Sequence, residues 1–192
     1  MKSIIFNQHQ VNHALKNKEG MFREVCKKQP QGEMEKPYVI RDMGIGAFHY
    51  PFGKCPYQIG QKIFVKETFS DERFGASLIY KAGNVIEKIT HWRTASNMKQ
   101  EHSRLTLRIK SVKVERLQDI SEEDCWKEGL DLDSEHSRLC FNIEEQPYSN
   151  DLINGSAIKT IFTKNWNSTH KKPEEKWEAN PFVFCFSYEV VR

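Results

Sequence analysis

The first thirty residues gather positive charge that could bind phosphate groups. The formal net charge of the whole chain is only +3, so no overall positive field requires a nucleic-acid partner. A phosphate-binding surface must therefore be local. This segment either provides one or forms the solvated face of a helix. Its charged residues are Lys16, Lys18, Arg23, Lys27 and Lys28, opposed by Glu19 and Glu24.

A second group of residues could act as acids and bases. Histidine suits RNA strand cleavage because it changes charge near neutral pH. His91 and His102 lie in the polar stretch 90–102, which we expect to be a loop, and Glu67 and Tyr80 precede them. These residues could support a hydrolase. The alternative is that both histidines are simply hydrated in a polar loop.

The five cysteines do not form a metal-binding pattern. Their spacing is wide, without a Cys-x-x-Cys pair or zinc-like histidine intervals, so we expect no metal and mainly buried, apolar thiols. No Gly-rich phosphate loop is present, and we expect no cofactor. Because no signal-like start and no membrane-length apolar run occurs, a cytoplasmic location without membrane association is expected. The cysteines are Cys26, Cys55, Cys125, Cys140 and Cys185.

The elements of the first half can be placed from local signals. The chain has 192 residues, 38% of them hydrophobic, which suits a single folded domain. A strand is predicted over Lys2–Phe6. Asn7 can then cap a helix over Gln10–Lys18, which Gly20 ends or bends. The stretch Gln61–Phe69 is rich in β-forming residues and predicts a strand, and a further strand is expected over 78–82.

The second half alternates strands and short helices. The alternation of Leu105–Lys110, continued with the same period by Val112–Leu117, predicts a half-buried strand with a basic solvent face. Ser121 is expected to cap a helix that Gly129 ends.

The final third adds one helix and one strand. Apolar spacing predicts a helix over 157–166. A closing strand is expected over 181–191, and its run Phe182–Phe186 predicts burial on both faces. Mixed strands with short helices and no repeat favour an α+β fold or a small barrel. Loop excursions are expected at about 29–53 and 131–156.

Four segments, in order along nearly the whole chain, resemble the phage-type ASCH family, a PUA-like group. The resemblance implies one domain over 1–192, an α+β small mixed β-barrel with peripheral short helices. It also implies a cleft for RNA, nucleotides or modified nucleosides. Some relatives are amidohydrolases of acetylated cytidine, and others are linked to RNA cleavage. The segments are CPYQIGQKIFVKETF at 55–69, VERLQDIS at 114–121, NWNS at 165–168 and WEANPFVF at 177–184.

The resemblance also suggests that reactive groups are missing. Hydrolytic relatives carry a Gly-x-Lys-Thr-x-x-Arg stretch, whose lysine and threonine act with a glutamate on a later strand. In the matching stretch here, 17–23, Glu19 replaces the lysine and Gly20 replaces the threonine. Arg23 and Glu67 match the family's arginine and glutamate. Either these two form a structural ion pair, or Glu67 remains an acid.

Two further positions bear on the cleft. Lys18 lies one residue from the lysine position, and in a helix this displacement turns the side chain by roughly 100°. A Trp-x-Pro-Ser-x-His-Met-Pro loop lines the cleft of relatives. The matching stretch here, 92–99, keeps Trp92 and Met98 without the prolines and the histidine. Trp92 either stacks on a base or packs in the cleft wall.

Three functions are consistent with these features. The first is non-catalytic binding of RNA or a nucleotide, with an affinity that falls as salt is added. The second is a phage or prophage factor that inhibits a host defence protein through its loop excursions. The third is a hydrolase of N-acylated cytidine, or a ribonuclease, acting through Glu67. The residues expected to bind the ligand are Lys18, Arg23, Lys66, Tyr80, Trp92 and Arg93.

Overall fold

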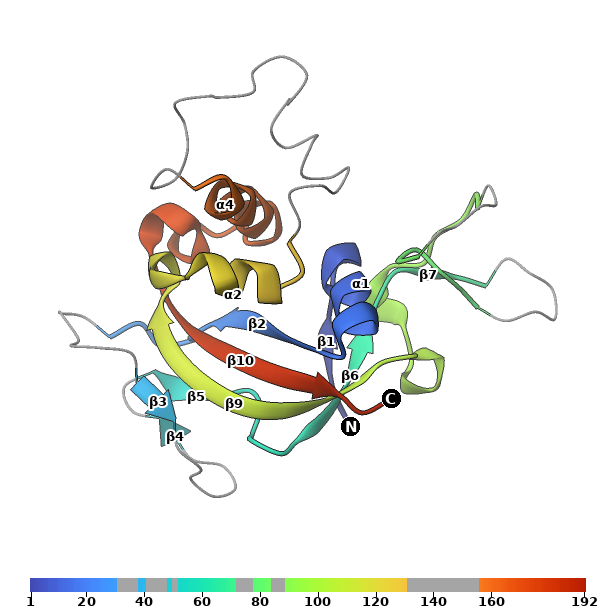
Figure 1. Cartoon of the computed structure of the whole chain (residues 1–192), viewed down its shortest axis with the longest axis horizontal. Helices are drawn as coiled ribbons and strands as arrows, with labels where there is room; N and C mark the ends of the chain where they lie inside the picture. Colours follow the sequence, from blue (N-terminus) through green and yellow to red (C-terminus); the bar gives the residue numbers. More distant parts are fainter. Residues whose placement is uncertain (31–37, 41–47, 50–51, 72–77, 84–88, 131–155) are drawn as a thin grey trace, which may run out of the picture.

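The computed structural model describes residues 1–30, 38–40, 48–49, 52–71, 78–83, 89–130 and 156–192 (Figure 1). Its strands and helices confirm the α+β class. The strands are β1 (Lys2–Ile5), β2 (Glu19–Val25), β3 (Tyr38–Ile40), β4 (Phe48–His49), β5 (Gly53–Lys54), β6 (Lys62–Lys66), β7 (Phe69–Ser70), β8 (Ile79–Tyr80), β9 (Thr106–Arg116) and β10 (Phe182–Val190). The helices are α1 (Gln8–Asn17), α2 (Glu122–Lys127) and α4 (Ala157–Thr169), with five single-turn 3₁₀ helices at 95–97, 100–102, 117–119, 173–175 and 177–179.

One sheet organises the molecule. Its main path runs β1-β6-β9-β10-β2, and β3 pairs with β9 outside this path. The long strand β9 pairs with β6 near its start, with β3 near its end and with β10 along its length. Among the described strands, β1 and β2 are the two ends of this path and do not pair with each other. The described part of the chain therefore does not form the closed barrel expected from the sequence.

Strand β9 matches the half-buried strand with a basic face, with one difference. Leu107 and Ile109 are buried, whereas Arg108 and Lys110 are exposed. After Ser111 the buried positions change phase, because the register with β10 shifts between Ser187 and Tyr188. An extra residue of this kind is a β-bulge, so the prediction of one continuous period was wrong at this point.

The sheet separates two apolar cores. In the first core, Phe22 of β2 stacks on Phe186 of β10 with ring centroids 4.9 Å apart, and α1 packs against this side. In the second core, α2 and α4 pack with side chains of β2 and β10. Phe184 belongs to the first core and Val183 to the second. The predicted burial of this run on both faces is confirmed.

The N-terminal segment differs from the expectation. Asn7 caps α1, as predicted. Asn7 and Gln10 exchange two hydrogen bonds between side chain and backbone, which is the capping-box arrangement. However, the helix ends at Asn17, and its C-cap Lys18 adopts a left-handed conformation with φ 62°. Gly20 therefore does not end the helix but lies in β2, whose pairing with β10 runs from Glu19 to Val25. The charged segment is not one helix face, and the helical argument for Lys18 was wrong.

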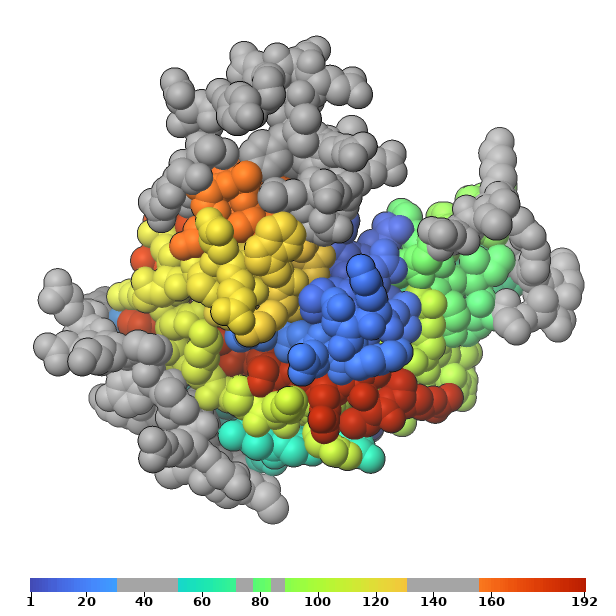
Figure 2. Space-filling model, in the orientation of Figure 1, coloured from blue at the N-terminus to red at the C-terminus, as the bar shows by residue number. Residues whose placement is uncertain are grey.

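Helix α2 is confirmed by its cap and its stop. The Ser121 hydroxyl accepts a hydrogen bond from the Asp124 amide, and Gly129 has φ +87°. A Cβ at Gly129 would lie 2.7 Å from the His9 carbonyl oxygen, so the chain after α2 touches α1 closely. Figure 2 shows these two helices against each other above β10.

The expected excursions are only partly described. In the region 29–53 the structure describes residues 29–30, β3, β4 and residues 52–53, whereas 31–37, 41–47 and 50–51 lie outside the described residues. In the region 131–156 only Ser156 is described. In the described ranges, no helix combines the length and the apolar character needed to cross a membrane.

Candidate binding cleft

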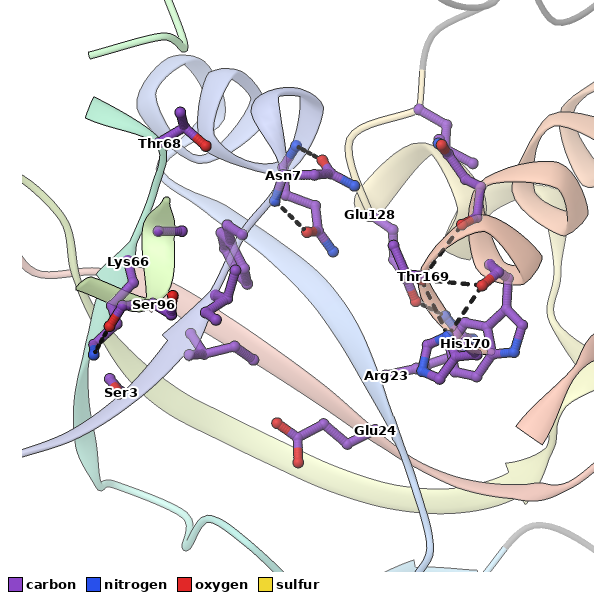
Figure 3. A pocket seen from close by; sticks show the side chains of 18 of the residues that line it. Ser3, Asn7, Arg23, Glu24, Lys66, Thr68, Ser96, Glu128, Thr169 and His170 are labelled. Atoms are coloured by element: carbon purple, nitrogen blue, oxygen red, sulfur yellow. Dashed lines mark hydrogen bonds and ion pairs between the residues drawn. The ribbon is translucent and has the colours of Figure 1, made fainter. Parts of the chain in front are cut away.

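An open cleft of about 710 Å³ lies between β1 and β2, the two ends of the sheet path. Its walls come from β1, β2, the end of β6 and α4 (Figure 3). Because β1 and β2 are not paired, side chains between them can face this space. The polar and aromatic residues that matter most are Asn7, Gln10, Glu24, Tyr57, Lys66 and His170.

Lys66, one of the predicted ligand-binding residues, lines the cleft, and its cationic side chain is partly exposed. Its ammonium donates a hydrogen bond to the Ser96 carbonyl oxygen, at 3.0 Å. An ammonium has three donors, so this bond leaves capacity for a ligand. Thr68 and Ser96 line the same side (Figure 3). This side of the cleft suits a phosphate or another anion.

The opposite side is aromatic and comes from α4. The rings of Trp166 and His170 stack with centroids 3.9 Å apart and an interplanar angle of 12°. Phe162 stacks on Trp166 in turn, at 5.8 Å. The indole nitrogen of Trp166 donates to the Glu175 carbonyl oxygen at 2.7 Å, which holds the ring in place. His170 is only partly buried, so its ring can present a face to a ligand.

Glu24 lies between these two sides and carries a perturbed carboxyl group. It accepts a hydrogen bond from the Tyr57 hydroxyl at 3.1 Å. Burial raises the pKa of Glu24, and the hydrogen bond from Tyr57 and the charge of Lys27 only partly oppose this effect. Clefts that hold such carboxyls are frequent functional sites. The Glu24 carboxyl therefore takes up a proton more readily than an exposed glutamate does.

Arg23 borders the cleft, but its charge is engaged within the protein. Its side chain has 0% exposure, and one terminal nitrogen lies 2.7 Å from Glu115 and 3.0 Å from Asp124. The other terminal nitrogen bonds to Glu128. Lys113 adds a second cation, at 2.9 Å from Glu115 and 3.1 Å from Asp124. Arg23 is thus placed to hold β2, β9 and α2 together.

The protonation of this cluster follows from its charge balance. Two cations face three carboxylates. Burial opposes ionisation of Asp124, but the hydrogen bond from Lys113 and the charge of Arg23 outweigh it, so the pKa of Asp124 is lowered. Burial raises the pKa of Glu128 despite its bond to Arg23. The cluster therefore favours a proton on Glu128 over one on Asp124.

Glu67 belongs to a separate cluster and does not line the cleft. It is 2% exposed, and both of its oxygens lie 2.8 Å from nitrogens of Arg104. The Arg104 guanidinium lies over the Tyr80 ring, 4.3 Å from its centroid, and the Tyr80 hydroxyl donates to the His102 carbonyl oxygen. Glu67 thus forms a structural ion pair, as one alternative predicted, but its partner is Arg104 rather than Arg23.

The remaining predicted binding residues lie away from the cleft. Lys18 is exposed at the end of α1. Arg93 pairs with Asp71 at 2.7 Å on the surface, next to Trp92, and neither Arg93 nor Trp92 is part of the lining. Of the six residues, the structure therefore brings only Arg23 and Lys66 to the cleft.

The two positions that align with the lysine and threonine of hydrolytic ASCH proteins also lie elsewhere. Glu19 and Gly20 line a different cavity, next to Trp126 and Tyr188. A Cβ at Gly20 would lie 2.5 Å from the Tyr188 hydroxyl and 2.8 Å from the Lys127 carbonyl oxygen. A threonine would not fit there without displacing Tyr188.

Sequence reasoning missed several residues of the cleft. Glu24 was noted only as a charge that opposes its basic neighbours, and Tyr57 was not singled out as a site residue. His170 lies in a charged stretch with no local pattern. The one available signal for Tyr57 was its place in the first segment that resembles the ASCH family.

The thiols show no metal-binding arrangement among the residues described. No group of three His, Cys, Asp or Glu side chains there is placed to hold a metal ion. Burial raises the pKa of Cys26 to about 12 and that of Cys55 to about 11. These two groups are therefore poor nucleophiles at neutral pH. Cys140 lies outside the described residues.

The candidate site is thus defined by its geometry, with Lys66 on one side, the Trp166–His170 stack on the other and Glu24 between them. Known proteins do not add to this definition. Comparison of the chain with family models, with curated proteins and with solved structures finds no match in any of the three.

Proposed function

We propose that this protein binds a nucleotide unit of RNA in the cleft between β1 and β2, without turning it over. One observation carries the proposal: a single open cleft combines an ammonium, an aromatic stack and a half-buried carboxyl. A nucleotide has a charged phosphate, a flat base and polar edges. Each of these has a chemical counterpart in the cleft.

The contacts would divide between the two sides. Lys66 neutralises the phosphate, which makes binding weaker as salt is added. The His170 ring offers a surface for the base, and base–aromatic stacking contributes about 1 to 3 kcal/mol. The amides of Asn7 and Gln10 line the cleft and suit ribose hydroxyls or base edges, although each already makes a capping bond.

The absence of turnover is supported by the position of the reactive groups. Glu67 is held by Arg104, and Glu19 and Gly20 line a different cavity. The residues that match the relatives' catalytic set are therefore not assembled around one substrate. Lys66 lines the cleft, but its ammonium bonds to the Ser96 carbonyl oxygen and not to the Glu67 carboxylate (Figure 3).

Titration with nucleoside monophosphates, monitored by tryptophan fluorescence or NMR, tests the proposal. We expect binding at low salt that weakens on the order of tenfold in Lys66→Ala, because one phosphate contact is lost. His170→Ala should weaken it further by removing a stacking surface. Lys62→Ala is the matched control, since Lys62 is exposed on the same strand and outside the cleft. If neither monophosphates nor RNA bind at low salt, the proposal is wrong.

Hydrolysis is the second candidate, and Glu24 is the observation that favours it. A buried carboxyl with a raised pKa can give its proton to a leaving amine or alcohol. Incubation with acetylcytidine and with end-labelled RNA would reveal this activity. Turnover that Glu24→Gln abolishes would replace the binding proposal. The protein-interaction role remains a prediction, because the loops it invokes lie mostly outside the described residues.

A further inference from the structure

The cleft continues into a second cavity along the gap between β1 and β2. This cavity measures about 570 Å³ and shares Ser3, Glu24 and Tyr57 with the cleft. Since three residues line both spaces, a ligand that fills the cleft can extend past them. We call the second space the lysine cavity, because its lining includes Lys2, Lys27 and Lys54.

Three separate elements bring these lysines together. Lys2 lies in β1, Lys27 follows β2, and Lys54 lies in β5. The Lys2 ammonium donates to the Pro56 carbonyl oxygen at 2.5 Å and lies 5.9 Å from the centroid of the Tyr57 ring. Local sequence patterns do not reveal this grouping, because the three lysines are far apart in the chain.

Within the described ranges, the positive charge of the lysine cavity is not neutralised by ion pairs. Several other lysines, such as Lys113, Lys127 and Lys172, pair with carboxylates within 3.1 Å. In the part of the chain that the structure describes, no such pair involves Lys2, Lys27 or Lys54. The nearby carboxyl is Glu24, whose pKa is raised by burial and lowered in part by the charges of Lys27 and Lys2.

We propose that the lysine cavity holds the sugar-phosphate backbone next to the nucleotide in the cleft, so that the ligand is single-stranded RNA rather than a free mononucleotide. This inference rests on the proposed function. A positive groove that follows the backbone, beside aromatic groups that stack on bases, is the usual arrangement for single strands. A base that stacks on the His170 ring in the cleft must first leave its neighbours in a duplex, which favours a single strand.

Binding of a labelled RNA octamer, compared with a nucleoside monophosphate, tests this inference. We expect the wild-type protein to bind the single-stranded octamer at least tenfold more tightly than the monophosphate or the same sequence as a duplex. In Lys27→Ala/Lys54→Ala, octamer affinity should fall on the order of tenfold, and the slope of log K against log salt should change by about 1.4. Monophosphate affinity should stay within about twofold of wild type, because those lysines lie outside the cleft.

The matched control is Lys16→Ala/Lys62→Ala, which removes the same charge from exposed positions outside both cavities. All four lysines are exposed, so both variants should keep the wild-type melting temperature. If the monophosphate binds but the octamer binds no more tightly, or if the control loses as much affinity, the lysine cavity is not a backbone site. That outcome leaves the cleft proposal intact. Failure of both ligands to bind overturns both proposals.

Discussion

Arg23 illustrates how the role of one residue depends on its partners. Its side chain is fully buried and contacts three carboxylates. Two of these carboxylates, those of Glu115 and Asp124, also pair with Lys113. A cation in such a place stabilises the fold by keeping buried charges paired. Loss of RNA binding in an Arg23 variant would therefore not by itself identify Arg23 as a ligand-binding residue.

Replacement of Arg23 should destabilise the protein strongly. Arg23→Ala leaves Glu115, Asp124 and Glu128 with one cation, and such losses cost about 3 to 5 kcal/mol. Chemical denaturation would measure this change in the free energy of unfolding. Arg93→Ala is the control, because its ion pair with Asp71 is exposed and its removal should leave the unfolding midpoint nearly unchanged. An Arg23 variant as stable as this control would contradict the structural role.

Glu24 should make stability depend on pH. Burial raises its folded-state pKa above the unfolded value, so the folded state binds the proton more tightly. Stability should then decrease as pH rises from the unfolded pKa through the folded one. Glu24→Gln removes this charge and should be more stable than wild type above that window, with the difference vanishing below it.

Melting curves from about pH 4 to about pH 8 would measure this difference. The Gln amide oxygen can still accept the bond from Tyr57, so packing is preserved. Glu174→Gln, at an exposed position, serves as the control and should show no such trend. A difference between Glu24→Gln and wild type that does not vary with pH would mean that the carboxyl is not perturbed by burial.

Among the elements, the junction between β6, β8 and β9 depends on the pair between Glu67 and Arg104. Glu67 follows β6, Arg104 precedes β9, and Arg104 also donates to the Ala82 carbonyl oxygen beyond β8. Since β6 and β9 already pair with each other, Arg104 adds a link from their junction to the segment after β8. The Glu67 carboxyl thus has a structural role outside the cleft.

Glu67→Gln should lower stability and leave ligand binding unchanged. Gln cannot pair with both guanidinium nitrogens as a charged acceptor, and an unsatisfied buried group costs about 1 to 3 kcal/mol. Thermal unfolding would measure the loss, and the nucleotide titration would measure affinity. Arg104→Lys should cause a similar loss, since Lys cannot form the two-pronged contact. A Glu67 variant with unchanged stability but no affinity would restore Glu67 as a site residue.

At the scale of the whole molecule, β10 joins the two cores. Phe184 and Phe186 pack in the first core, and Val183 and Cys185 pack in the second. Neighbouring positions of one strand thus belong to opposite faces of the sheet. Neither core can lose its contacts with β10 without weakening the other.

The protein should therefore unfold in one cooperative step. Trp166 and Trp177 report on the second core, and far-UV circular dichroism reports on the sheet and helices together. The two signals should give the same midpoint in urea, as two-state unfolding requires. Two separated transitions, with the tryptophan signal lost first, would show that the helical layer unfolds on its own.

The sequence alone determined the features that depend on neighbouring residues. Asn7 and Ser121 cap helices because their side chains reach amides three positions away. The run Phe182–Phe186 is buried on both faces because continuous apolar strands need cover on both sides. Strand β2 was missed because its charged and apolar residues do not alternate regularly. It forms a strand because it pairs with β10, and this pairing outweighs local propensity.

Only the tertiary structure decided where the cleft lies and which residues serve it. The family pattern suggested a contact between Arg23 and Glu67. In the structure, strand register and helix packing instead pair Arg23 with carboxylates about a hundred positions away, and Glu67 pairs with Arg104. Glu24 and Lys66 line one space because Lys66 lies in β6, which pairs with β1 at one end of the sheet path, and Glu24 lies in β2 at the other end. Such long-range choices depend on register and sheet order, which neighbouring residues do not encode.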